Sequence, residues 1–197
     1  MNAAALAVAL PGLTDEQLAV SFTDGVDGCF DELVRRYGGP LYAFALRMVG
    51  KPEDADDLVQ DVFVQLLKSL PTARPGMPLR PWVYVIARNK CLDHLKRKKA
   101  LAFSSLATEE GGEGIEEWLE GAEPLPEELA ERADLRELLQ AAIATLAPRY
   151  RTVVALRYST DLTFGEIGAV LELPENTVKT HFQRAKGMLR GALRERL

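Results

Sequence analysis

The feature that most constrains the fold of this chain is a helix-turn-helix pattern at residues 163–186. Thr163 and Glu166 have the spacing of a capping box, which begins a helix. Pro174 follows the end of that helix, and apolar residues at helical spacing begin a second helix around Val178. In such a motif the second helix lies in the major groove of DNA. The pattern therefore makes DNA the first partner to test.

A second DNA-binding signal lies upstream, at residues 80–99. An apolar stretch that carries Trp82 and Tyr84 passes into a basic one without a helix breaker after Pro81, so one helix should carry both. Its cationic residues could follow a nucleic-acid backbone. Trp82 and Tyr84 could serve as stacking platforms or belong to the core, and the sequence leaves both roles open.

Charge is distributed unevenly along the 197 residues, whose formal net charge is −5. Residues 101–133 hold ten glutamates against one arginine, whereas residues 1–100 and 134–197 are slightly basic. The total excludes a uniformly basic DNA-coating protein, and local basic faces decide nucleic-acid binding.

Apolar spacing predicts an all-α fold, because no segment alternates with period two for long enough to form a strand. Prolines make 70–81 a loop, and Gly38-Gly39-Pro40 should kink or split the helix that begins near residue 30. The Gly- and Pro-interrupted acidic segment predicts a flexible linker. The predicted organisation is an N-terminal tail (1–27), a helical domain (28–100), an acidic linker (101–133) and a helix-turn-helix domain (134–197).

The sequence contains no motif of catalytic or metal-binding residues. Cys29 and Cys91 are far apart, which argues against a disulfide scaffold or a zinc site, and His94 and His181 have no neighbouring ligands. We predict no catalytic residues, no metal and no cofactor. The apolar N-terminal run lacks a basic flank and is too short to span a bilayer, so we expect a cytoplasmic protein without membrane insertion.

Three stretches together resemble the extracytoplasmic-function (ECF) sigma factors of the sigma-70 family: residues 54–63, 82–89 and 163–186. The resemblance covers about 30–99 and 135–194. It implies two small helical domains, one like sigma region 2 and one like region 4. It also implies a factor that directs bacterial RNA polymerase core to promoter DNA and assists strand opening, with an anti-sigma factor as a further partner.

The resemblance places core-polymerase binding on the acidic helix near residue 60. One exposed strip of that helix lies off its apolar stripe and could meet a basic partner. A solvated helix face is the alternative. The predicted core-binding residues are Asp57, Gln60, Asp61 and Val64.

The resemblance also assigns the two DNA elements of a promoter. The helix of residues 80–99 would contact and melt the minus-ten element through Arg80, Trp82, Tyr84, Arg88, Asn89, Lys96, Arg97 and Lys98. The second helix of the C-terminal motif would read the minus-thirty-five element through Glu175, Asn176, Thr177, Lys179, Thr180, Gln183, Arg184 and Lys186.

An alternative function is a helix-turn-helix regulator that binds DNA without polymerase, although such a chain should carry a sensing α/β domain in front. The acidic linker adds a further hypothesis. Its glutamates resemble an occupant of the polymerase's RNA channel, and a solubilising tether is the alternative. The linker residues concerned are Glu109, Glu110, Glu113, Glu116, Glu117 and Glu120.

Overall fold

The computed structural model describes residues 10–72, 78–106 and 127–194 of the chain. Within these ranges every regular element is a helix, as the sequence predicted. The elements are η1 (Leu10–Gly12), α2 (Asp15–Thr23), α3 (Cys29–Val49), α4 (Pro52–Ser69), η2 (Leu70–Thr72), α5 (Leu79–Leu106), α6 (Glu127–Thr145), α7 (Pro148–Ser159), α8 (Phe164–Leu171) and α9 (Glu175–Arg194).

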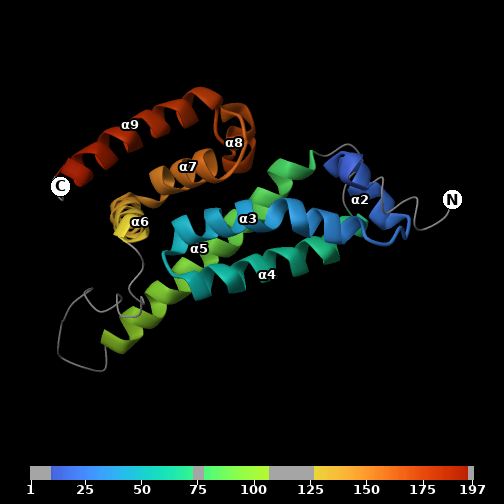
Figure 1. The fold of residues 1–197 in the computed structure, drawn as a ribbon, viewed down its shortest axis with the longest axis horizontal. Helices are drawn as coiled ribbons and strands as arrows, with labels where there is room; N and C mark the ends of the chain where they lie inside the picture. Colours follow the sequence, from blue (N-terminus) through green and yellow to red (C-terminus); the bar gives the residue numbers. More distant parts are fainter. Residues whose placement is uncertain (1–9, 73–77, 107–126, 195–197) are drawn as a thin grey trace.

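Helix α3 is the centre of the N-terminal unit and packs against α2, α4 and α5 (Figure 1). It runs unbroken through Pro40, so a split at Gly38-Gly39-Pro40, one of the two predicted outcomes, is wrong. The physical reason is tertiary packing on both sides of the proline. Leu33, Tyr37 and Phe44 are all buried, and their burial outweighs the poor helix propensity of the segment between them.

Part of the segment predicted as a loose N-terminal tail forms the helices η1 and α2, and this part of the prediction is wrong. Thr14 and Gln17 form a capping box that begins α2, with the two reciprocal bonds at 2.8 and 3.2 Å. Leu10 and Leu18 are buried against the N-terminal unit. Arg36 donates to Asp15 at 2.8 Å and ties α2 to α3. The capping box and the two leucines are visible in the sequence, but the segment is too short for a clear helical period.

The C-terminal unit contains α6 to α9, and α8 and α9 form the predicted helix-turn-helix. Thr163 and Glu166 make the predicted capping box of α8. The turn after α8 is tight. An added Cβ on Gly168 would lie 2.6 Å from the backbone oxygen of Leu173, and Glu172 has φ 55°. Only a glycine permits that close approach between α8 and the turn.

The two units pack directly against each other, with α3 beside α7 and α5 beside α8 (Figure 1). Their buried residues form one continuous core. Side chains of the C-terminal unit also bond to the end of α3: Gln140 donates to the Leu46 carbonyl at 2.7 Å, and Arg151 donates to the Met48 carbonyl at 3.1 Å. The sequence predicted two domains but carried no sign of this contact.

Helical structure also extends into both sides of the predicted linker, because α5 continues to Leu106 and α6 begins at Glu127. The glutamates from Glu109 to Glu120 lie outside the described residues, as do residues 73–77 of the proline-rich loop. The proposed role of the acidic segment in the RNA channel stays a prediction.

Candidate nucleic-acid and partner interfaces

Helix α9 presents a polar face to solvent along one side. Val178, Phe182 and Ala185 are buried beneath it against the rest of the C-terminal unit. The helical repeat places the residues of the outer face next to one another. These exposed residues are Asn176, Lys179, Thr180, Gln183 and Arg184.

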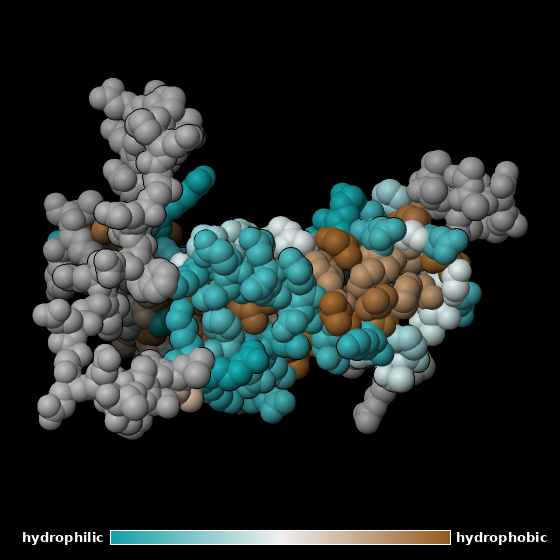
Figure 2. All heavy atoms as spheres, turned by 90° about the horizontal axis from the view of Figure 1, so that it is seen from below, coloured by the Kyte–Doolittle hydropathy of each residue, from teal (hydrophilic) through white to brown (hydrophobic). Residues whose placement is uncertain are grey.

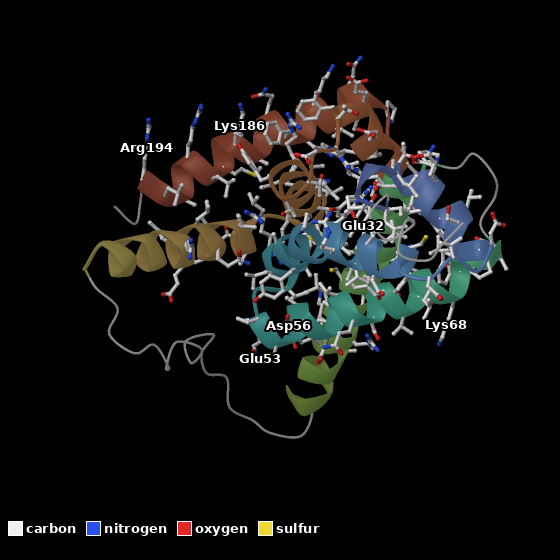
Figure 3. All side chains as sticks on the ribbon, turned by 45° about the vertical axis from the view of Figure 1, so that its right-hand side comes forward. Glu32, Glu53, Asp56, Lys68, Lys186 and Arg194 are labelled. Atoms are coloured by element: carbon white, nitrogen blue, oxygen red, sulfur yellow. The ribbon has the colours of Figure 1, made fainter. Side chains whose placement is uncertain are left out.

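The other three residues predicted to contact the minus-thirty-five element are Glu175, Thr177 and Lys186, and each has a different setting. Glu175 is exposed and pairs with Lys179 at 2.6 Å, so the first turn of α9 carries an internal ion pair. Thr177 is half-buried at the opposite edge. Lys186 lies at the rim of the buried face, 5.3 Å from the centre of the Phe182 ring. In Figure 3, Lys186 and Arg194 lie along α9, on the far side of the molecule from Glu53 and Asp56 of α4.

Tyr150 of α7 supports this helix, and the sequence did not predict that role. Its ring packs edge-on against His181 with the ring centres 5.3 Å apart. The guanidinium of Arg184 beside the Tyr150 hydroxyl lowers the pKa of that phenol, and Arg149 adds to the effect. Tyr150 therefore lies beside Arg184 at the edge of the outer face of α9. In the sequence, Tyr150 is only an aromatic residue shortly after Pro148. An ordinary core residue would look the same there.

The first turns of α5 are anchored in the core. Tyr84 is 2% exposed, with its ring edge-on to Phe44 at 6.0 Å, and burial raises its pKa. Trp82 is half-buried and packs against the same core. The sequence left two roles open for Tyr84, a stacking platform or a core residue. In this structure its ring packs in the core.

The remaining half of α5 carries the cationic side chains outward. Asn89, Lys96, Arg97 and Lys98 are exposed, and Arg88 is half-buried. Lys96 pairs with Asp93 within the helix at 3.5 Å. We use the name basic track for the set Arg88, Lys90, Lys96, Arg97, Lys98 and Lys99.

The four residues predicted to bind polymerase lie together on α4. They line a shallow groove of about 520 Å³ between α4 and α5, and His94 and Arg97 form its other side. We call Asp57, Gln60, Asp61 and Val64 the docking strip. Val64 is 49% exposed, so the strip combines carboxylates with an uncovered apolar side chain.

Ion pairs connect the docking strip helix to the basic track. Asp61 pairs with Lys90 at 3.4 Å, and Asp54 lies 3.4 Å from Lys98 and 3.2 Å from His94. Asp54 and His94 were not predicted as site residues. Sequence spacing assigns each a place on its own helix but carries no information on which faces of α4 and α5 meet.

A polar cavity of about 280 Å³ lies where the two units meet. The α7–α8 connection forms one side of it, and α2, α3 and the start of α5 form the other. Arg80, a predicted minus-ten residue, faces this cavity. The lining residues are Asp15, Arg36, Tyr37, Pro40, Arg80, Tyr84, Tyr158, Ser159, Thr160 and Asp161.

Neither a metal centre nor a membrane span is found in the described part of the chain. No group of three or more His, Cys, Asp or Glu within these residues could hold a metal ion. None of the described helices is long and apolar enough to cross a bilayer. Cys29 and Cys91 are both buried, and burial raises the pKa of the Cys91 thiol to about 12.

Comparison with known proteins matches both units to one family. Residues 33–101 match the model of Sigma-70 region 2, and residues 136–189 match Sigma-70, region 4. SigW of Bacillus subtilis, an ECF RNA polymerase sigma factor, is 30% identical over 173 residues, which cover 87% of this chain and 92% of SigW. The RNA polymerase sigma factor CnrH of Cupriavidus metallidurans is 31% identical over 185 residues, covering 93% and 96%.

Two solved structures share the fold. CnrH in complex with the cytosolic domain of CnrY has a TM-score of 0.67 at 25% identity and covers 92% of this chain and 97% of its own. The sigma factor RpoE of Bartonella quintana, in complex with the anti-sigma factor NepR, has a TM-score of 0.64 at 20% identity, covering 84% and 96%. The order of the two sigma regions, the helix-turn-helix and the similarity to SigW together show that the chain belongs to the ECF group of the sigma-70 family.

Proposed function

We propose that this chain directs RNA polymerase core to specific promoters and assists strand opening. It would use three surfaces: the outer face of α9, the docking strip on α4 and the basic track on α5. The observation that carries the proposal is the outer face of α9, where polar and basic side chains lie on the second helix of a helix-turn-helix. A separate docking strip on α4 lies on the other unit. A factor that carries the α9 face and the docking strip can link DNA to a protein partner.

The docking strip supports polymerase binding through mixed chemistry. Asp57 and Asp61 offer carboxylates to a basic partner, and Val64 offers apolar area. Leu67, one turn further along α4, is 43% exposed. Figure 2 shows apolar side chains gathered toward the end of the molecule where α2 lies and hydrophilic ones over the middle of the same face. A partner that covers α4 would bury apolar surface and neutralise the neighbouring charge.

Strand opening needs no chemical step of the protein's own, so we propose no enzymatic activity. A protein that binds unpaired strands better than paired ones shifts the equilibrium toward the open form. Trp82 would contribute an aromatic surface, and Arg97 and Lys98 would neutralise phosphates. The α9 face would fix the position of the unit on duplex DNA through base and phosphate contacts.

We also propose an anti-sigma partner and a cytoplasmic place of action, where polymerase and chromosome lie. The relative CnrH was solved bound to the cytosolic domain of CnrY. In this chain an apolar groove of about 450 Å³ lies among α6, α7 and α9 of the C-terminal unit, with Leu139, Ile143 and Leu189 among its lining residues. It offers a protein partner an apolar surface on the C-terminal unit, with Arg47 of α3 at its edge.

Reconstituted transcription tests the proposal. Purified chain and bacterial core polymerase are combined with the DNA upstream of the chain's own gene, and run-off transcripts are measured. We expect discrete transcripts that require both proteins. Binding of the free chain to one DNA site without any effect of core polymerase would instead establish the polymerase-independent regulator.

A further inference from the structure

Glu175 and Lys179 lie together at the exposed start of α9. Oε1 of Glu175 is 2.6 Å from Nζ of Lys179, and the two side chains are 51% and 49% exposed. The glutamate comes four residues before the lysine, which is the favourable order for such a pair on a helix. The second helix of the helix-turn-helix therefore presents a hydrogen-bond acceptor and a donor side by side.

The start of α9 is held against α8. A Cβ added to Gly168 would lie 3.7 Å from the amide nitrogen of Glu175, so the two backbones are close to contact there. A Cβ added to Gly165 would lie 3.5 Å from Oε2 of Glu175, which places the carboxylate directly over α8. Because its backbone and its carboxylate are both held, Glu175 loses little conformational freedom when it binds a partner.

A carboxylate at this position restricts the DNA that α9 can bind. Phosphates repel it, and the guanine and thymine edges in the major groove offer it only acceptors. The donors in the major groove are the amino groups of cytosine and adenine. Without such a donor opposite, the carboxylate would lose water on binding and gain no hydrogen bond. Glu175 therefore favours sequences that place an amino group opposite it.

We propose that Glu175 and Lys179 together read one G·C base pair of the minus-thirty-five element. Lys179 donates to O6 and N7 of the guanine, and Glu175 accepts from the N4 amino group of the paired cytosine. The ammonium group has three donors, so two remain for the guanine when one is bonded to Glu175. A G·C pair presents two adjacent acceptors and then a donor, and these two side chains satisfy all three. An A·T pair presents its donor between two acceptors, so one acceptor would stay unpaired.

The inference rests on the proposed reading of promoter DNA by α9, and a selection experiment tests the two separately. Holoenzyme made from the full chain and core polymerase is incubated with promoter duplexes randomised over the minus-thirty-five element, and the bound fraction is sequenced. The natural chain should prefer G·C at one position by roughly 5- to 150-fold. Glu175→Met and Lys179→Met should each lose most of that preference and keep the preferences at the other positions.

Asp93→Asn is the matched control for this selection. It breaks an ion pair with Lys96 that also lies within one helix, on α5. All base preferences should survive in this variant. Preference of the natural chain for A·T at the position that the two methionine variants alter would overturn the proposal, and so would unchanged preferences in both variants.

Two modified duplexes test the individual atoms at the selected position. A deazaguanine removes the N7 acceptor, and a pyrimidinone in place of cytosine removes the N4 amino group. Either base should weaken binding of the natural holoenzyme in band-shift titrations. Lys179→Met should be insensitive to the deazaguanine, and Glu175→Met should be insensitive to the pyrimidinone.

The pyrimidinone duplex also separates base reading by Glu175 from a merely structural role. If Glu175 only held Lys179 in place, Glu175→Met would weaken binding but remain as sensitive to the pyrimidinone as the natural chain, and that result would overturn the proposal. A natural holoenzyme that selects no sequence over the randomised element and yields no transcripts would overturn the proposed function, and the inference with it.

Discussion

Lys90 of α5 lies 3.4 Å from Asp61 of α4, so one residue of the basic track pairs with one residue of the docking strip. Asp54 and Lys98 repeat this arrangement further along the same two helices. A partner that binds the carboxylates of α4 competes with the lysines of α5 for them. If polymerase binds the docking strip as proposed, its docking would be coupled to release of the basic track for DNA.

Reversing the charge of the docking strip should abolish binding to core polymerase. Asp57→Arg together with Asp61→Arg places like charges against a basic partner surface, and both positions are exposed, so the fold should survive. Co-purification with core polymerase measures binding, and circular dichroism checks the fold. Asp93→Arg on α5 is the control and should bind normally. Full co-purification of the double variant would rule out this surface.

Truncating the outer face of α9 should weaken promoter binding. Lys179→Ala and Arg184→Ala should each cost about 1–3 kcal/mol of binding free energy if the side chain reads a base, and this cost should vanish on a promoter altered in its minus-thirty-five element. Band-shift titration of holoenzyme on both promoters measures this. Arg136→Ala, an exposed residue of α6 in the same unit, is the control. Equal costs on both promoters would mean phosphate contact rather than base reading.

Removing charge from the end of the basic track should reduce the salt dependence of DNA binding. Replacing Arg97, Lys98 and Lys99 with Ala should lower the slope of log affinity against log salt by roughly 0.7 for each single-strand phosphate that the variant no longer neutralises. Titration of the single-stranded minus-ten element at several salt concentrations measures the slope. Lys68→Ala, at the exposed end of α4, should keep it. An unchanged slope in the triple variant would show that these three residues face solvent only.

Gly168→Ala should destabilise the C-terminal unit by about 1–3 kcal/mol, because the new Cβ would lie 2.6 Å from the Leu173 carbonyl oxygen. Gly165→Ala, in the same helix, is the matched control. Its Cβ would meet the Glu175 side chain at an ordinary 3.5 Å, so it should be neutral or slightly stabilising. Urea unfolding of both variants gives the two free energies of unfolding. Equal stabilities would contradict the tight turn.

Glu32 should contribute stability at neutral pH that disappears in acid. Hydrogen bonds from Arg35 and Arg36 lower its pKa from the usual 4.5 to about 2. Because the folded pKa is the lower one, the ionised group stabilises the fold above about pH 4.5, and that contribution is lost as pH falls toward 2. The difference in unfolding free energy between the natural chain and Glu32→Gln should therefore shrink over this window, as urea unfolding at several pH values would show. Glu137→Gln, on the exposed surface of α6, should show no such trend.

The sequence by itself determined the helices and most of their surfaces. Capping residues such as Thr163 and Glu166 act within a few residues, and apolar spacing is a local property, so both locate α4, α8 and α9 without knowledge of the tertiary fold. The exposed residues of α9 followed from the same helical repeat. The family followed from the order of three local motifs.

Tertiary structure decided which faces meet. Pairing of Lys90 with Asp61, packing of Tyr84 against Phe44 and the closeness of Arg184 to Tyr150 all join residues from different helices. Periodicity predicts the direction of a side chain about its own helix but says nothing about the neighbour that it reaches. The continuity of α3 through Pro40 and the placement of the α7–α8 connection and Arg80 around one cavity depend on the same long-range contacts, and these exist only once the whole chain has folded.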